Sequence, residues 1–248
     1  MKHASAFVGV LIFAAVAGCN AGTSTREGAP AAVPVDASAP IYETTEYKIR
    51  AVTVVDGLTY PYCFAFLPDG SILLTEMGGR LRLIRDGKLM ADPVTGTPEV
   101  YSDAPSHGLM DIALHPKFSE NHLVYFSYNK SGEKGVTEAV ARGVFDGAKL
   151  TDVKDIFVAD AWAKTKGRQN SRIAFAPDGS LYVTGSVGGK IDRAQDMKDH
   201  AGKVLRIRDD GTVPGDNPFV RRAGYRPRHH RGDPDRRRDT LGQHGCRD

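Results

Sequence analysis

The sequence predicts an all-β chain that forms part of a β-propeller, and three observations support this prediction. Residues 64–84 and residues 173–191 both place the pattern Phe-x-Pro-Asp-Gly-Ser between runs of β-branched and aromatic residues. Residues 112–128 repeat the arrangement with a longer turn. The turn prolines of the three copies lie 48 and 61 residues apart, near the length of a four-stranded propeller blade. These prolines are Pro68, Pro116 and Pro177. The alternative fold is a β-sandwich whose hairpins resemble one another by chance.

Residues 1–19 have the organisation of an export signal. Two basic residues precede an apolar run from Phe7 to Ala17, and this run of about 11 residues is too short to cross a bilayer. The sequence Val-Ala-Gly-Cys at Val16–Cys19 resembles the lipobox of bacterial lipoproteins. That resemblance implies that Cys19 is lipidated and anchors an exported protein to a membrane, in the periplasm or at the outer membrane. Asn20 in place of Asp favours the outer membrane. The alternative is an ordinary cleaved signal with an unrelated cysteine.

Residues 20–45 are rich in Ala, Pro, Gly, Ser and Thr, which predicts a flexible linker. The alternating residues of Tyr47–Val55 then predict a strand. Residues 64–84 predict strand, Pro-Asp-Gly turn, strand, Gly-Gly turn and strand, because Pro presets φ, Asp bonds the backbone and Gly accepts positive φ. Residues 173–191 predict the same order, with a hairpin turn at Gly185–Lys190. Residues 194–203 are expected to form a loop or one short helix.

Residues 46–227 are expected to hold about three blades. Three blades cannot close a ring and protect its edge strands, so the chain is expected to be a truncated part of a larger propeller. Residues 228–248 contain two hydrophobic residues among 21 and six arginines, which predicts an irregular tail. This tail is either an out-of-frame end of the gene or a natural disordered Arg-rich segment.

The charge balance argues against a nucleic-acid partner. The chain has 33 Lys and Arg against 30 Asp and Glu, a formal net charge of +3. The tail supplies most of that excess, so the body is nearly neutral and offers no basic face. The 3 cysteines cannot form a disulfide framework, and Cys63 and Trp162 are expected to be packing residues.

Four stretches of the body resemble the glucose/sorbosone dehydrogenase family of PQQ-dependent aldose sugar dehydrogenases. They are residues 107–128, 171–184, 194–220 and 222–227. The resemblance implies a six-bladed propeller, of which this chain matches the N-terminal half. It also implies PQQ and calcium as cofactors, and a small-molecule sugar or sugar acid as the partner. In that family the C1 hydroxyl of an aldose is oxidised to a lactone.

The resemblance assigns site positions, and the chain departs from the family at several of them. The family's His base corresponds to Arg168, four residues before Arg172, and an arginine cannot accept the proton. Ser106 stands where the family has Gln, and Ser106 and Gln169 are expected to contact substrate. His107 is a candidate replacement base, since imidazole suits proton transfer at neutral pH. The alternative for His107 is a histidine exposed on a loop.

Further departures indicate a diverged active site. Gly167 replaces the acidic residue before the base, and Ser186–Val187 replace a Gly-Asp pair. The family's later PQQ and calcium ligands are not recognisable in the chain, so the cofactor-binding residues are expected outside it. Arg168 is expected to clamp an anionic sugar or a PQQ acid group, unless it is a surface arginine beside an acidic neighbour. The chain alone is therefore expected to be inactive, and the alternative function is a non-catalytic β-propeller binding module on the cell surface.

Other histidines and aspartates are expected to have structural roles. His115 is expected to belong to its turn, and His200 to bond the backbone of a neighbouring loop. The aspartates between residues 192 and 210 do not have the spacing of an EF-hand and are expected to bond turn backbones. His229, His230 and Cys246 lack the spacing of a zinc site.

Overall fold

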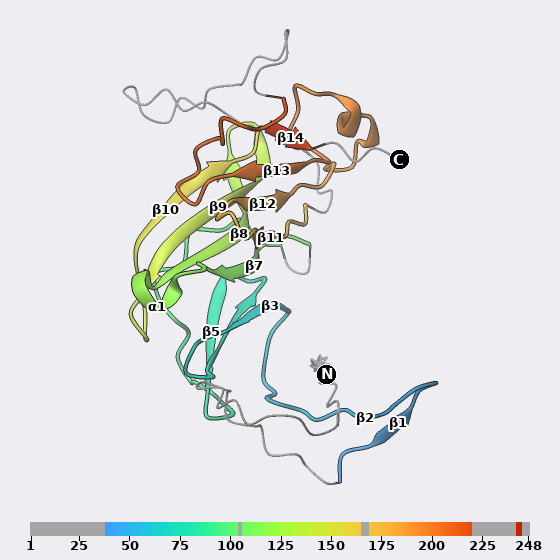
Figure 1. The fold of residues 1–248 in the computed structure, drawn as a ribbon, viewed down its shortest axis with the longest axis vertical. Coiled ribbons are helices and arrows are strands. Elements are labelled where there is room, and N and C mark those ends of the chain that lie inside the picture. The colour runs from blue at the N-terminus through green and yellow to red at the C-terminus, as the bar shows by residue number, and fades with distance from the viewer. Residues whose placement is uncertain (1–37, 104–105, 165–168, 220–241, 245–248) are drawn as a thin grey trace, which may run out of the picture.

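A computed structural model describes residues 38–103, 106–164, 169–219 and 242–244 of the chain. These residues form three four-stranded antiparallel sheets and one separate two-stranded hairpin. Figure 1 shows the sheets following one another in an arc, with their first strands β3, β7 and β11 on the same side. The all-β fold and its three propeller blades are thereby confirmed. None of the helices in the described part is long and apolar enough to cross a membrane.

Each sheet is built from four strands that are consecutive in the sequence. The first sheet contains β3 (Pro61–Phe66), β4 (Ile72–Glu76), β5 (Arg80–Arg85) and β6 (Lys88–Leu89). The second contains β7 (Leu109–Leu114), β8 (Leu123–Gly132), β9 (Gly135–Phe145) and β10 (Leu150–Val158). The third contains β11 (Ile173–Phe175), β12 (Leu181–Thr184), β13 (Val204–Ile207) and β14 (Gly242–His244). The hairpin consists of β1 (Ile41–Glu43) and β2 (Lys48–Arg50), and the helices are α1 (Phe118–Asn121) and η1 (Ile191–Gln195).

The two Pro-Asp-Gly-Ser copies form the same turn, as their sequences predict. The Oδ1 atoms of Asp69 and Asp178 each accept a hydrogen bond from the backbone N–H two residues later, at 2.9 Å. The glycine that follows each aspartate has a φ near +80°, a conformation that side chains disfavour. The third copy is also confirmed, because α1 occupies the longer turn between β7 and β8.

The predicted hairpin turn at Gly185–Lys190 is wrong. The chain leaves β12 at Thr184, passes through η1, and returns to the sheet only at Val204. Val204–Ile207 buries alternate side chains and supplies the third strand, whereas Ile191 is 79% exposed. The loop is fastened at its end by Lys203, whose buried Nζ donates hydrogen bonds to the carbonyl oxygens of Arg193 and Ala201.

Three further boundaries differ from the prediction. Only Lys48–Arg50 of the expected strand Tyr47–Val55 is a strand, because Val54 and Val55 pack instead onto the first sheet. The paired strand β1 lies inside the expected linker, so regular structure begins before residue 46. Gly242–His244 pairs with β13 as an outer strand, because the edge of β13 offers unsatisfied backbone groups. The expectation of an irregular tail therefore does not hold for these three residues.

Two apolar clusters hold the sheets together. Leu73, Leu81, Leu109 and Phe126 belong to the cluster between the first and second sheets. A second cluster, which includes Val140 and Leu205, joins the second and third sheets. At one end of the blades, which we call the rim, β10 and β12 end and β7, β11 and β13 begin, and the β12–β13 loop of residues 185–203 lies there. The Pro-Asp-Gly turns lie at the opposite end.

Candidate functional site

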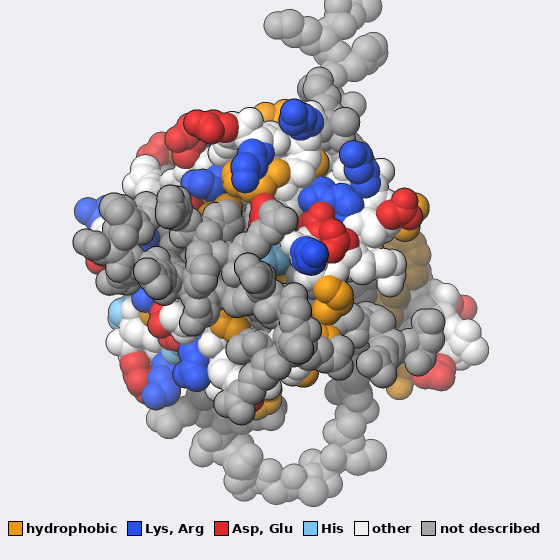
Figure 2. Space-filling view, turned by 90° about the horizontal axis from the view of Figure 1, so that it is seen from above, with side chains coloured by type: hydrophobic (Ala, Val, Ile, Leu, Met, Phe, Trp, Pro, Cys, Tyr) orange, Lys and Arg blue, Asp and Glu red, His pale blue; other side chains and the backbone are white. Residues whose placement is uncertain are grey.

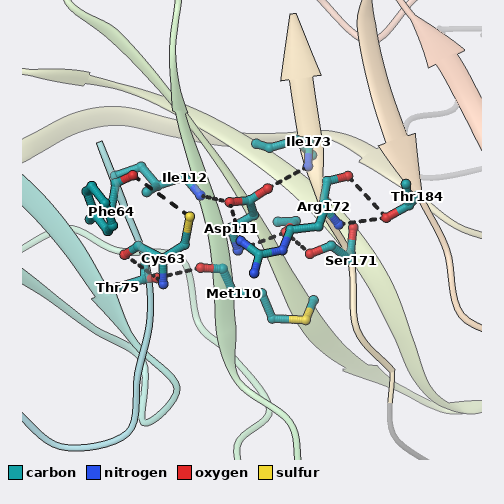
Figure 3. A network of polar contacts seen from close by, with 11 residues as sticks. Cys63, Phe64, Thr75, Met110, Asp111, Ile112, Ser171, Arg172, Ile173 and Thr184 are labelled. Carbon is teal, nitrogen blue, oxygen red and sulfur yellow. Dashed lines mark hydrogen bonds and ion pairs between the residues drawn. The ribbon is translucent and has the colours of Figure 1, made fainter. Parts of the chain in front are cut away.

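The first strands of the three sheets bring three polar side chains together near the rim. Strand β7 contacts both β3 and β11. The guanidinium of Arg172, just before β11, lies 4.7 Å from the centroid of the Tyr62 ring on β3. Its Nη1 is 3.3 Å from Oδ1 of Asp111 on β7. Figure 3 shows the contact between Arg172 and Asp111, whose carboxylate also accepts a hydrogen bond of 2.8 Å from the N–H of Ile173.

A thiol and a hydroxyl extend this network towards the first sheet. The hydroxyl of Thr75 accepts the N–H of Cys63 at 3.1 Å and donates to the carbonyl oxygen of Met110 on the second sheet. Burial, and to a lesser degree the neighbouring Asp111 carboxylate, raises the pKa of the Cys63 thiol. A thiol that keeps its proton is a poor nucleophile, so Cys63 acts in packing, as its sequence context predicts.

His107 is buried at the rim, and the interpretation as an exposed loop histidine is wrong. Its side chain is 1% exposed, and its Nδ1 lies 2.5 Å from Oδ1 of Asp103. The ring of Tyr101 meets the imidazole edge to face, with the centroids 5.4 Å apart. A carboxylate at Nδ1 fixes the ring's orientation. Next to it, the Ser106 N–H donates to the Asp103 carbonyl oxygen at 3.3 Å, within a turn.

Gln169 is also buried, and its side-chain amide makes a hydrogen bond within the protein. Its Nε2 donates to the Val136 carbonyl oxygen at 3.0 Å, and its backbone carbonyl accepts from Nδ2 of Asn129 at 3.1 Å. Its Oε1 finds no hydrogen-bond partner among the described residues. These two hydrogen bonds fix the chain just before it enters the third sheet. They leave the Oε1 atom of Gln169 as an acceptor that is not yet used.

Glu138 is a buried carboxyl that the sequence analysis does not identify. It is 2% exposed, and its Oε1 accepts hydrogen bonds from the N–H and hydroxyl of Ser186, at 2.9 and 3.0 Å. Its Oε2 has no partner among the described residues, and burial raises the pKa of Glu138 to about 7. The sequence contains one signal that could have identified Glu138. It is a charged residue inside the run Val136–Ala141, whose other side chains are small and uncharged.

The remaining structural predictions agree with the contacts. His115 Nδ1 accepts the N–H of Lys117 within its turn, and His200 Nδ1 accepts the N–H of Asp160 in the loop after β10. Asp196, Asp199 and Asp210 each accept a backbone N–H two residues later. Arg168, Gly167 and Cys19 lie outside the described residues.

Elsewhere, the described residues offer less for ligand binding. A polar hollow at the turn end contains Arg206, whose donors are taken by Ser180, Asp178, Asp216 and Asn217. No group of three or more His, Cys, Asp or Glu within the described ranges could hold a metal ion. The face seen in Figure 2 has acidic and basic side chains interspersed. The candidate site therefore consists of the network of Tyr62, Asp111 and Arg172 at the first strands, together with the buried residues at the rim.

Known proteins resemble this chain over the same residues. A sequence model described as glucose/sorbosone dehydrogenase matches residues 58–230. An uncharacterised protein from Synechocystis is 41% identical over 199 residues, covering 73% of this chain and 48% of the relative. The aldose sugar dehydrogenase YliI of Escherichia coli is 33% identical over 182 residues, covering 72% of this chain and 49% of the relative. The chain thus spans about half the length of these relatives.

Solved structures have the same fold over a similar part of the chain. A crystal structure of a glucose dehydrogenase is 33% identical and superimposes with a TM-score of 0.66, covering 70% of this chain and 51% of that protein. The PQQ-bound form of an aldose sugar dehydrogenase from Streptomyces coelicolor is 28% identical, with a TM-score of 0.58. That match covers 67% of this chain and 49% of the other.

Proposed function

The chain belongs to the glucose/sorbosone dehydrogenase family, and from this premise we propose that it is part of a PQQ-dependent enzyme oxidising an aldose at C1 to a lactone. The observation that supports this proposal is the family match over residues 58–230, which includes the strands β3 to β13 and both connections between sheets. About half of each relative's length lies outside the match. The complete reaction is therefore a proposal and is not assigned to the matched residues alone.

The described residues do not by themselves form a complete site for PQQ or calcium. No group of three or more His, Cys, Asp or Glu within them could hold a metal ion, and Arg172, paired with Asp111 through Nη1, is a single cation beside the first strands. PQQ, when bound, would supply the two-electron acceptor for the sugar.

The role proposed for this half of the molecule is to build the wall that holds the sugar. Burial of His107 and its contact with Asp103 favour a positioning role for its imidazole, because a side chain that is 1% exposed gives a sugar no direct approach. Ser106, in the same turn, and Arg168, beyond the described residues, remain proposed contacts to a sugar or sugar acid. The changes at family positions support an altered substrate preference.

Dye-linked oxidation tests the proposal. The protein as its host produces it is purified, supplied with PQQ and calcium, and assayed with neutral aldoses and with uronic acids. We expect dye reduction that needs PQQ and yields a lactone detectable by NMR. A control without PQQ, after chelation of metals, should be inactive. If the protein supplied with PQQ and calcium binds a sugar tightly but does not oxidise it, the result would contradict the proposed enzymatic activity. It would support the alternative, a non-catalytic binding module.

We also propose that the protein is exported and held on a membrane by lipid on Cys19, which rests on the Val-Ala-Gly-Cys sequence alone. Two or more acyl chains hold a protein stably on a membrane surface. Full-length protein should fractionate with membranes and incorporate labelled fatty acid, whereas Cys19→Ala should do neither. Incorporation of label into Cys19→Ala protein would overturn the assignment.

A further inference from the structure

Arg172 is held in a fixed position by all three sheets. Its backbone N–H donates to Oγ1 of Thr184 on β12 at 2.8 Å, and its carbonyl accepts the Thr184 N–H at 2.9 Å. Tyr62 on β3 stacks on the guanidinium, and Asp111 on β7 binds Nη1. The orientation of the planar group is therefore set before any ligand arrives, which reduces the entropy lost on binding.

Asp111 does not use up the binding capacity of this arginine. The Asp111 carboxylate is buried, and besides Arg172 it accepts the backbone N–H groups of Ile173 and Ile112, at 2.8 and 3.1 Å. A guanidinium has five N–H donors. Within the described part of the chain, Nη1 is the atom of the Arg172 guanidinium that makes a hydrogen bond. The Arg172 side chain is 57% exposed, so its remaining edge is accessible.

The charge of the cluster limits what can bind at that edge. Arg172 and Asp111 together carry no net charge, so a dianion would meet the repulsion of Asp111 with only one cation to offset it. A carboxylate carries one negative charge and matches the planar edge of a guanidinium with two parallel hydrogen bonds. Tyr62 covers one face of the group and leaves the edge open.

We propose that Arg172, held by Tyr62 and Asp111, is a carboxylate-binding site on the inner wall of the blades. Two molecules carry a carboxylate of this kind, namely a sugar acid and PQQ, and the choice of these two rests on the proposed function. In either case the carboxylate binds the open edge of Arg172 through hydrogen bonds, and no covalent bond is made or broken. The site lies on the first strands of the sheets, beside the rim.

Binding measurements test the site without requiring turnover. Affinities of the full chain for glucuronate, for glucose and for PQQ are measured by calorimetry. We expect Arg172→Gln to weaken binding of a carboxylate ligand by about 10- to 100-fold, typical of a charged hydrogen bond, with no change for glucose. A loss for glucuronate alone identifies a sugar acid as the occupant, and a loss for PQQ alone identifies the cofactor. Failure to oxidise aldoses would contradict the proposed function but leave this result intact.

A control variant separates binding from folding. Arg80→Gln is the matched control, because Arg80 is also about half exposed and paired with a buried carboxylate, Glu76, but lies on β5. It should leave all three affinities unchanged. The proposal is overturned if neither glucuronate nor PQQ binds the wild-type chain, or if folded Arg172→Gln binds both as tightly as wild type.

Discussion

Glu138 is the residue whose chemistry depends most clearly on its place in the fold. Burial raises its pKa to about 7, whereas an unfolded chain has a value of about 4.3. The folded state therefore keeps the proton that the unfolded state loses between these values. Stability from this group is complete below about pH 4.3 and falls as the pH rises to about 7. We expect the free energy of unfolding to fall by roughly 2 kcal/mol between pH 5 and pH 7, at 1.36 kcal/mol per unit.

Urea unfolding of wild type and Glu138→Gln at pH 5, 6 and 7 measures this dependence. The variant cannot titrate, so its stability should lack this fall. Glu43→Gln is the control, because Glu43 pairs with Lys48 on the surface of the separate hairpin, and it should keep the wild-type dependence. Equal pH dependence in wild type and Glu138→Gln would contradict the assignment.

At the scale of elements, the turn after β13 ties the third sheet to the second. Gly211 has a φ of +89°, and a Cβ added there would collide with the carbonyl oxygen of Ile156 on β10. Gly147, between β9 and β10, has a similar φ of +99° and open space around it. Gly147→Ala should cost about 1–2 kcal/mol of stability through the backbone alone. Gly211→Ala should lower the stability by several kcal/mol more, because of the collision with Ile156. Thermal unfolding measures both losses, and equal losses for the two variants would contradict the close approach of Gly211 to Ile156.

The elements predicted well are those whose signal is local. Pro-Asp-Gly-Ser specifies a turn by its own hydrogen bonds, and both copies are found, as is the third repeat with its longer turn. A Gly-Gly pair specifies only that the backbone can turn, so Gly188–Gly189 could not indicate whether the next residues would pair. The pairing is decided by Val204–Ile207, which fits the core between the second and third sheets.

The candidate site was harder to predict, because it depends on contacts between distant residues. The burial of His107 follows from the packing of its loop onto Met77, through the hydroxyl of Ser102. Glu138 joins the site through Ser186, 48 residues later. The sequence does not indicate that Arg172 belongs to the site, because its partners Tyr62 and Asp111 are 110 and 61 positions away.

At the scale of the whole molecule, the outer face of the first sheet is only partly covered. Val54, Val55 and Leu58 pack on the cluster of Ile72, Leu74 and Ile84. Phe64 belongs to the same face, and Phe66 stands beside it with ring centroids 5.5 Å apart and 42% of its surface exposed. Tyr60 and Met90, near the ends of the same sheet, are 41% and 40% exposed. Exposed apolar residues on or next to one sheet are typical of an interaction surface.

The 248-residue chain, produced alone, should therefore self-associate through this face. Light scattering coupled to gel filtration measures the association, and the charged variant Phe66→Lys should shift the material towards monomer, because a lysine resists burial in an apolar contact. Ile191→Lys is the control, since Ile191 is 79% exposed on η1, away from the first sheet. It should leave the association unchanged. A wild-type chain that elutes as a monomer at all concentrations, or equal effects of the two lysines, would show that the face of the first sheet does not drive association.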